Sequence, residues 1–256
     1  MKLLGDKLAR KIQVDLSKRP QPMGDLVIIK MGKNRVSEIY ISKKIEFAKS
    51  LGVKVRVIEA TEKNIFEYIE KLNNDKNIRA VFLQLPIPSS VDRNKVLSAI
   101  KASKDVDGFH YILGLEDAKT IPPTILAIHE FLKFHNVDLE KGVLIVGGGF
   151  LVGKPLRKFL QSKNIEAEIL QKNESHYAQK LLSADVSVVA TGVGNIFNGD
   201  EFKVGATVID ASTVACEDRL GGDVEEPGSS KISLAPVPGG VGPVTVAMLF
   251  RNFFDL

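Results

Sequence analysis

The stretch VLIVGGGFLVGKP, residues 143–155, combines an apolar strand pattern, a run of three glycines and the start of a helix pattern. Glycines at such a turn let backbone N–H groups approach a pyrophosphate, and the amino end of the following helix favours negative charge. Gly147 and Gly149 fit the first two positions of G-x-G-x-x-G, but Val152 stands at the third position and Gly153 follows it. We therefore predict a dinucleotide site here; the alternative is a tight strand-to-helix turn that binds no ligand.

Strand and helix patterns alternate on both sides of this stretch. Before it, short apolar or alternating runs predict strands at residues 25–31, 53–60 and 78–86, and helical spacing predicts helices at residues 37–52, 64–75 and 92–101. The first of these helices would begin with Ser37 as its N-cap and end at Gly52. After it, the alternation continues to residue 212. This rhythm predicts an α/β fold with parallel sheets that are covered by helices.

The alternation is interrupted between residues 104 and 124, where TIPPT contains two prolines that exclude a helix interior. We predict a first domain at residues 1–118 and a second, Rossmann-like dinucleotide-binding domain at residues 119–240. An apolar helix at residues 241–256 follows a strand of the second domain, and from the topology we expect this helix to return and complete the first domain.

The composition is that of a soluble globular protein, with 44% hydrophobic and 26% charged residues among 256. No apolar run approaches the ~18 residues of a membrane-spanning helix, and residues 1–16 have the charges of an amphipathic helix, so we expect a cytoplasmic protein. The net charge is +4 without a basic block that is interleaved with aromatics, so we expect no nucleic-acid surface. The four histidines lack metal-ligand spacing and Cys216 is the only cysteine, so we expect no metal site.

Candidate cofactor residues follow the strands of the second domain, where ligands bind in open parallel sheets. Gly192 ends the segment ATG and could approach the nicotinamide ribose. Lys172 lies near the tip of the second strand, while Glu166 and Glu168 come too early to reach a ribose hydroxyl. A cation at that tip suits a 2′-phosphate and favours NADP over NAD, although Lys172 could also be an ordinary exposed lysine.

Candidate polar residues of the first domain also fall near strand ends. Tyr40 and Lys44 lie four residues apart and share one helix face. Gln84 ends a strand, directly before Leu85 and a proline, and Asp107 lies just before Gly108 in the turn DVDG. Taken singly, Tyr40 and Lys44 could be an ordinary surface pair, and Gln84 and Asp107 could each belong to a capped turn. Taken together, these four residues indicate a pocket at one edge of the sheet.

Five segments, in order along the chain, carry a resemblance to a known family. They are GKNRVSEIYISKK (32–44), VFLQLPIP (81–88), KDVDGFH (104–110), IVGGGFLVGKP (145–155) and GDVEEPGSSKISLAPVPGGVGPVTVAMLFRN (222–252). Together they resemble the bifunctional methylenetetrahydrofolate dehydrogenase/methenyltetrahydrofolate cyclohydrolase family over nearly the whole chain. The resemblance implies two α/β domains with a cleft between them, a folate-binding catalytic domain first, an NADP-binding domain second, and a homodimer.

The resemblance also implies roles for individual residues. Lys44 would be the catalytic lysine, Gln84 would hold and tune it, Tyr40 would stack on the aminobenzoate part of the folate, and Asp107 would hydrogen-bond the pterin ring. The implied substrate contacts add Leu85, Pro238, Gly239 and Gly242. The implied cofactor contacts are Thr124, Gly147, Gly148, Gly149, Lys172, Thr191, Gly192, Thr213 and Thr245.

Three departures from the family pattern fall on the cofactor side. The family's Arg-Ser pair is Gly148-Gly149 here, its P-C-T-P segment is residues 122–125 with the cysteine lost, and its D-x-G-I segment is residues 210–213 with the sequence DAST. We expect oxidation of methylenetetrahydrofolate with NADP followed by hydrolysis of the methenyl product. The alternatives are a dehydrogenase alone, an NAD-dependent enzyme, and a non-catalytic folate-binding or nucleotide-binding protein, against which the retained polar residues argue.

Overall fold

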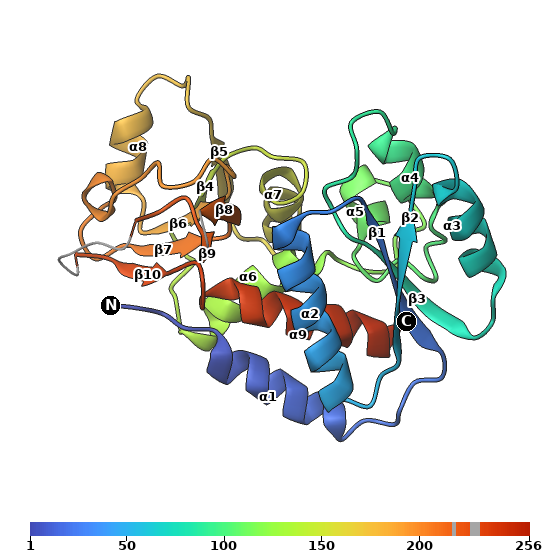
Figure 1. Cartoon of the computed structure of the whole chain (residues 1–256). Coiled ribbons are helices and arrows are strands. Elements are labelled where there is room, and N and C mark those ends of the chain that lie inside the picture. Colours follow the sequence, from blue (N-terminus) through green and yellow to red (C-terminus); the bar gives the residue numbers. More distant parts are fainter. Residues whose placement is uncertain (217–218, 226–230) are drawn as a thin grey trace. The chain divides into compact units, whose positions relative to one another are not determined.

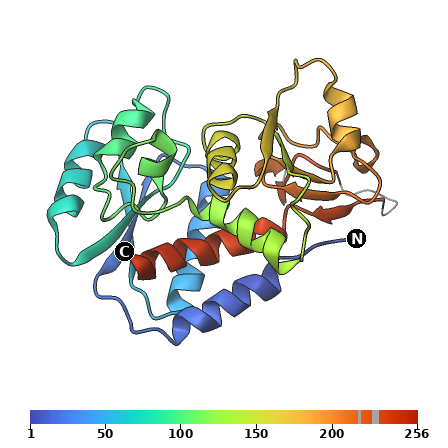
Figure 2. The same cartoon turned by 180° about the vertical axis from the view of Figure 1, so that it is seen from behind.

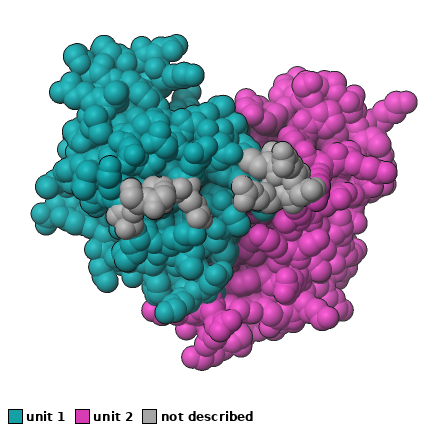
Figure 3. Space-filling model, turned by 60° about the vertical axis from the view of Figure 1, so that its left-hand side comes forward, with its two compact units in different colours: residues 1–9, 124–245 teal, residues 10–123, 246–256 magenta. Residues whose placement is uncertain are grey.

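The fold is described from a computed structural model that covers residues 1–216, 219–225 and 231–256. The chain divides into two compact units, and Figure 3 shows unit 1 (residues 1–9 and 124–245) in teal and unit 2 (residues 10–123 and 246–256) in magenta. Compared with the expected bounds, this division lies at residue 123 rather than 118 and places the first nine residues in unit 1. Residues 226–230, part of the carboxyl-terminal segment of the resemblance, lie outside the described residues.

Unit 2 is built on a parallel sheet of three strands, with the order β2-β1-β3 (Figure 1). The strands are β1 (Asp25–Met31), β2 (Val55–Ala60) and β3 (Ile78–Leu83). The central strand β1 is an apolar run because both of its faces are covered, and Leu26, Val27, Ile28 and Ile29 have no solvent exposure.

Helices cover both faces of this sheet. One face packs Ile28, Phe82 and their neighbours against apolar side chains of α1 (Asp6–Ser17), α2 (Arg35–Ser50) and α9 (Val241–Asp255). On the opposite side lie α3 (Ile65–Asn74) and α4 (Arg93–Ala99), as the views in Figure 1 and Figure 2 show. The short helix α5 (Phe109–Leu113), which the sequence did not predict, follows α4.

The predicted N-cap of α2 is wrong. The N-cap is Asn34, three residues earlier, because Asn34 has an extended backbone and its side chain accepts from the Ser37 N–H at 2.9 Å. Ser37 instead lies in the first turn, where its side chain is buried. The end of α2 at Ser50 agrees with the predicted stop near Gly52, which has a φ of 68°.

Unit 1 contains a parallel sheet of five strands with the order β10-β7-β6-β4-β5. In chain order they are β4 (Val143–Val146), β5 (Ala167–Leu170), β6 (Val186–Val189), β7 (Thr207–Asp210) and β10 (Ser233–Ala235). The strand order reverses between β4 and β6, so the crevice that binds ligands in such sheets lies outside the carboxyl ends of these two strands. The predicted α/β class, with a parallel sheet in each part and a Rossmann-like second part, is confirmed.

The sheet of unit 1 is also covered on both faces. Figure 2 shows α6 (Pro123–Phe134) and α7 (Gly153–Ser162) on one face and α8 (Tyr177–Ser183) on the other. Helix α6 begins at Pro123, since proline is tolerated in the first turn of a helix. The short helix η1 (Gly199–Glu201) and the ribbon of β8 (Val214–Cys216) and β9 (Arg219–Gly221) were not predicted.

The amino-terminal residues join unit 1 through backbone hydrogen bonds. Leu3 N donates to Leu234 O at 2.7 Å and Gly5 N donates to Gly239 O at 2.9 Å, so the segment lies along β10 and the turn that follows it. This long-range pairing explains why these residues depart from the expected division. Among the described residues, no helix combines the length and apolar character that crossing a membrane requires.

Candidate active site

Lys44 lies on the inward face of α2. The buried residues of this helix are Ser37, Ile41, Lys44 and Ala48, which recur at helical spacing and form one stripe. Lysine is seldom buried, yet the Lys44 side chain has only 7% exposure. Its Nζ donates to Gln84 Oε1 at 3.0 Å, and this hydrogen bond joins two residues that are 40 positions apart in the sequence.

The surroundings of Lys44 favour its neutral form. Burial lowers the pKa of Lys44 from 10.5 to about 8, and the negative charge of Asp107 opposes this fall. The change corresponds to about 3 kcal/mol in favour of the deprotonated amine. Nζ lies 4.2 Å from the centre of the Phe82 ring and 5.5 Å from that of Tyr40, so the amine is enclosed by aromatic faces.

Gln84 is held by the end of β3. Its N–H donates to Ile29 O at 2.8 Å, which extends the pairing with β1 by one residue past the strand. Its side-chain Nε2 donates to Leu85 O at 2.8 Å, and this bond turns Oε1 towards Lys44. The amide therefore accepts from the lysine without placing a second charge beside it.

Asp107 is positioned by a tightly packed loop. Gly108, which follows it, has a φ of 71°, and a Cβ there would lie 2.6 Å from Pro122 N, so only glycine fits. Asn252 of α9 donates from Nδ2 to Val106 O at 3.0 Å and to Ile121 O at 2.9 Å. Burial raises the pKa of Asp107 to about 7, although the charge of Lys44 lowers it.

Asp105 has a structural role in the same loop. Its side chain has 1% exposure, and Oδ2 accepts from the His110 backbone N–H at 2.8 Å, at the start of α5. Burial raises the pKa of Asp105. Its charge in turn raises the pKa of Asp107, so the loop supplies Lys44 with a neighbouring carboxyl group that protonates readily.

The glycine turn after β4 fits a dinucleotide. Gly147 has a φ of 105°, and a Cβ there would lie 2.8 Å from Ala190 O. A Cβ at Gly153, at the start of α7, would lie 2.0 Å from Gly147 O. These glycines let the turn, the end of β6 and α7 approach one another at the point where the strand order reverses, which leaves bare backbone for a phosphate.

The other predicted cofactor residues of unit 1 follow neighbouring strands. Lys172 is exposed after β5, Thr191 and Gly192 follow β6, and Thr213 is exposed after β7, while Thr124 lies in the first turn of α6. Because β4 to β7 are parallel neighbours, the residues that follow them lie along one edge of the sheet. The structure therefore brings most of the predicted cofactor residues to the expected edge.

The predicted substrate residues Pro238, Gly239 and Gly242 lie in the turn between β10 and α9 and in the first turn of α9. Gly239 has a φ of 101°, and Gly240 N donates to Pro236 O at 2.8 Å. A Cβ at Gly242 would meet no heavy atom within 4 Å, so packing does not demand glycine there. Thr245 donates from Oγ1 to Val241 O at 3.1 Å within the helix.

Two family profiles match this chain. The catalytic domain of tetrahydrofolate dehydrogenase/cyclohydrolase matches residues 3–107, and the NAD(P)-binding domain of the same family matches residues 122–256. This chain belongs to the tetrahydrofolate dehydrogenase/cyclohydrolase family. The family assignment that the sequence predicted is confirmed.

Individual family members are similar over the full length. The bifunctional protein FolD of Staphylococcus aureus strain JH9 is 34% identical over 252 residues, which cover 94% of this chain and 88% of that protein. The crystal structure of the bifunctional enzyme FolD from Campylobacter jejuni superposes with a TM-score of 0.88 at 31% identity and covers 100% of this chain and 97% of that one. The Trypanosoma brucei FolD, solved with NADP and an inhibitor, has a TM-score of 0.87 at 26% identity, with 99% and 96% covered.

Three residues that shape the candidate sites of this chain were not predicted from the sequence. Phe82 encloses Lys44 and could have been found, since residues two apart on a strand share a face and Gln84 was already a candidate. Asn252 could also have been found, because it is a polar residue on a buried face of the apolar helix α9. Asp223 lies in the quoted segment GDV, yet no pattern indicated its contacts.

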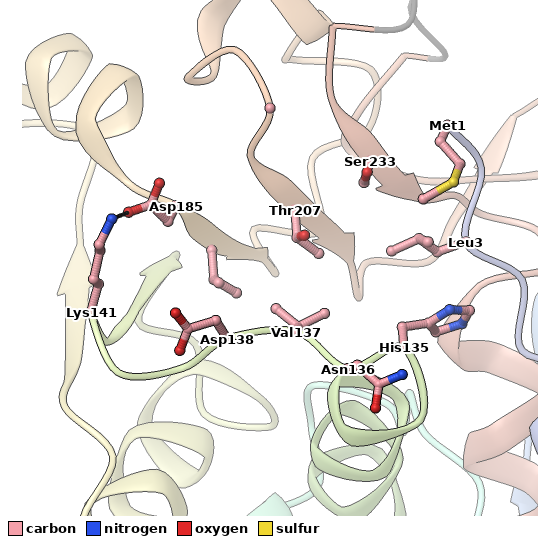
Figure 4. A pocket seen from close by; sticks show the side chains of 12 residues that line it. Met1, Leu3, His135, Asn136, Val137, Asp138, Lys141, Asp185, Thr207 and Ser233 are labelled. Carbon is pink, nitrogen blue, oxygen red and sulfur yellow. Dashed lines mark ion pairs between the residues drawn. The ribbon is translucent and has the colours of Figure 1, made fainter.

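A cavity of about 370 Å³ lies at the opposite end of the sheet of unit 1. Figure 4 shows that its lining includes Thr207 and Ser233, at the starts of β7 and β10, and the ion pair of Lys141 and Asp185, whose charged atoms are 3.2 Å apart. None of the predicted family site residues lines it. Among the described residues there is also no cluster of His, Cys, Asp or Glu that could hold a metal ion.

Proposed function

We propose that this protein oxidises 5,10-methylenetetrahydrofolate to 5,10-methenyltetrahydrofolate with NADP and then hydrolyses the product to 10-formyltetrahydrofolate. The observation that carries this proposal is the buried hydrogen bond of 3.0 Å between Lys44 Nζ and Gln84 Oε1, in a member of the tetrahydrofolate dehydrogenase/cyclohydrolase family. A buried amine with a pKa near 8 is suited to proton transfer near neutral pH.

The chemistry of the substrate accounts for this tuning of the lysine. The one-carbon bridge would lose a hydride, with both electrons of its C–H bond, to the oxidised nicotinamide that bound NADP would supply, and the methenyl bridge would become positive. A protonated amine beside that bridge would be repelled, and its pKa would fall further. Gln84 supports Lys44 as a neutral acceptor, so the site contains one fewer charge than a carboxylate at this position would give.

In the hydrolytic step, water attacks the positive bridge carbon and loses one proton. The bond from this carbon to N5 then breaks as the remaining hydroxyl proton is transferred to N5 and the formyl C=O bond forms. We assign the transfer of the proton that the water loses to Lys44, whose neutral form is already favoured by burial. General acid–base catalysis of this kind contributes typically about 10²–10⁴-fold to a rate.

We assign folate binding to the residues around the lysine. Asp107 would accept from a pterin N–H and the exocyclic amine, and its raised pKa places it between its two protonation states near neutral pH. Tyr40, half-buried one turn before Lys44, offers an aromatic face to the aminobenzoate part. Leu85, Pro238, Gly239 and Gly242 are the remaining proposed substrate contacts.

We assign NADP binding to unit 1. Gly147, Gly148 and Gly149 would hold the diphosphate, with Thr124, Thr191, Gly192, Thr213 and Thr245 as further contacts. Two observations at the tip of β5 support NADP over NAD. Lys172 is exposed there. Lys180 forms ion pairs with both Glu168 and Glu174, so these carboxylates would not be available to bind a ribose hydroxyl.

One spectrophotometric experiment tests the proposal. The purified protein is given methylenetetrahydrofolate with NADP or NAD, and the formation and decay of the methenyl product are followed. We expect formation with NADP and subsequent decay. A large preference for NAD would overturn the cofactor assignment, and the replacement of the family's arginine by Gly148 is the observation that supports this alternative. Formation of the methenyl product without its decay would identify a dehydrogenase alone.

Lys44→Met should abolish the enzyme-catalysed decay of added methenyltetrahydrofolate, because the variant lacks the amine that transfers the proton. The matched control is Lys43→Met, since Lys43 is exposed on the same helix and its Nζ lies 5.8 Å from the same Tyr40 ring. Hydrolysis that continues at the wild-type rate in Lys44→Met would contradict the role of Lys44.

We further propose a homodimer that acts in the cytoplasm and binds neither nucleic acid nor membranes. The dimer rests on the family, and the other assignments rest on the interspersed charges along the chain. Sedimentation equilibrium should give twice the mass of one chain, and a single-chain mass at all concentrations would contradict the dimer.

A further inference from the structure

The carboxylate of Asp223 receives an unusual number of hydrogen bonds from the loop that follows β6. Its Oδ2 accepts from Thr191 N and Thr191 Oγ1, both at 2.7 Å, and from Gly192 N at 3.1 Å. Its Oδ1 accepts from Val193 N at 3.1 Å and from Gly194 N at 2.9 Å. The Ser212 hydroxyl also donates to Oδ2. One side chain therefore holds four consecutive backbone N–H groups.

This carboxylate is buried and ionised. The side chain of Asp223 has 0% exposure. Burial alone would raise the pKa of Asp223, but the hydrogen bonds, led by that from Ser212, outweigh it and hold this pKa below its usual value. The arrangement resembles an anion-binding nest of backbone amides in which the anion belongs to the protein itself.

The loop held by Asp223 borders the glycine turn. A Cβ at Gly147 would lie 2.8 Å from Ala190 O and 3.3 Å from Thr191 Cα, so the two backbones are in contact beside the point where the strand order reverses. The N–H groups of Thr191 to Gly194 face Asp223 and are thus occupied. A phosphate beside this loop would meet no available donor from them and would be repelled by the carboxylate.

We propose that Asp223 is a positioning residue that fixes the loop of residues 191–194 against the glycine turn and reserves it for the ribose–nicotinamide half of NADP, which carries no phosphate beyond the diphosphate. The anionic diphosphate is thereby confined to residues 147–149 and the amino end of α7. This inference rests on the proposed function, because it assumes that NADP is the ligand of unit 1.

The variant Asp223→Asn tests the inference. An amide retains one acceptor oxygen and replaces the other with an NH₂ group, which cannot accept, so two of the four backbone N–H groups would lose their hydrogen bond to this side chain. Isothermal titration calorimetry is used to compare NADP with adenosine 2′,5′-bisphosphate, which lacks the nicotinamide half. We expect the affinity for NADP to fall about tenfold, as for the loss of one charge-assisted hydrogen bond, and the affinity for the bisphosphate to stay unchanged.

The matched control is Asp185→Asn. Asp185 also receives several charge-assisted contacts, from Lys141 and Lys203, but it precedes β6 and so lies at the opposite end of the same strand. Its replacement removes surface ion pairs without touching the loop of residues 191–194, and we expect both ligands to bind as in the wild type.

If Asp223→Asn does not fold, Ser212→Ala decides the question. Ser212 donates to Asp223 and accepts from Gly192 N at 3.1 Å, so its loss should weaken NADP several-fold without affecting the bisphosphate. The inference would be overturned if folded Asp223→Asn bound NADP as tightly as the wild type. If Asp223→Asn does not fold, the same result in Ser212→Ala would overturn it. Equal weakening of NADP and bisphosphate binding would also overturn it. A wild-type protein that binds neither ligand would instead overturn the cofactor assignment on which the inference rests.

Discussion

Residue 44 occupies a helical position that core side chains normally fill, three residues after Ile41 and four before Ala48. An apolar residue there would stabilise the fold, whereas the buried amine costs about 3 kcal/mol when it is protonated. This cost follows from the lowered pKa that makes the lysine useful for proton transfer. Burial of the Lys44 amine therefore lowers the stability of the fold and, through the same lowered pKa, makes the amine reactive.

The pH dependence of stability should reveal this exchange. Between pH 8 and the ordinary lysine value of 10.5, the unfolded chain keeps a proton on residue 44 that the folded protein has lost, so the free energy of unfolding rises with pH. Lys44→Met lacks this contribution. Across that range we expect the wild type to gain about 3 kcal/mol relative to the variant, as measured by urea denaturation.

Lys43→Met is the control for this measurement, since it removes an exposed lysine from the same helix. If the difference in free energy of unfolding between the wild type and Lys43→Met increased with pH by the same amount, residue 44 would not be the source of the pH dependence. A constant difference between the wild type and Lys44→Met would contradict the lowered pKa.

At the scale of elements, the turn between β10 and α9 combines a fixed and an open part. Gly5, at the amino terminus, packs so closely that a Cβ there would lie 2.2 Å from Gly240 O. Gly242 in the first turn of α9 is open, because a Cβ there would meet no heavy atom within 4 Å. Packing thus explains one glycine and leaves the other to be explained by a ligand.

Gly242→Ala should separate function from stability. We expect an unchanged free energy of unfolding and a raised KM for methylenetetrahydrofolate, because a methyl group at this position would occupy space that we assign to the folate. Steady-state kinetics and chemical denaturation of the same preparation provide both quantities. An unchanged KM would remove Gly242 from the proposed substrate contacts.

Gly5→Ala is the matched contrast for this element. Its added methyl group must displace the Gly240 carbonyl, and overpacking of this kind costs about 1–3 kcal/mol. We therefore expect the same chemical change to lower the free energy of unfolding in Gly5→Ala and to leave it unchanged in Gly242→Ala. Equal stability of the two variants would show that the amino-terminal segment does not hold the turn.

At the scale of the whole molecule, each unit is assembled from segments that are distant in the sequence. The last eleven residues, 246–256, belong to the unit that contains residues 10–123. Phe250 of α9 has no solvent exposure, and its ring stacks on that of Phe47 with 5.2 Å between centres. The carboxyl end of the chain thus completes a core whose other members lie more than a hundred residues earlier.

Phe250→Ala should lower the free energy of unfolding by about 3–5 kcal/mol, because it empties the position of a fully buried ring. The control is Phe66→Ala in the same unit, since Phe66 is 46% exposed on α3 and its loss should cost much less. Denaturation followed by circular dichroism measures both. Similar losses in the two variants would show that α9 does not complete this core.

Much of the fold could be predicted because its signals are local. The strand and helix runs, the glycine turn at residues 147–149 and the final helix each depend on side-chain periodicity or on backbone freedom within a few residues. The N-cap of α2 was missed by three residues because Asn34 and Ser37 are both acceptable caps, and only the backbone of the folded chain distinguishes them.

The sequence by itself determined the α/β alternation, the glycine and proline turns and the family, since all of these are encoded in neighbouring residues. The family resemblance also implied that Gln84 holds Lys44. Only the tertiary structure decided that Lys44 is buried, that its pKa falls to about 8, and that Asp223 accepts from the backbone N–H groups of the loop after β6. The hydrogen bond between Lys44 and Gln84 spans 40 positions, and the hydrogen bond from Gly194 N to Asp223 spans 29. Their energies depend on which side chains the sheets bring together, and no local pattern records that.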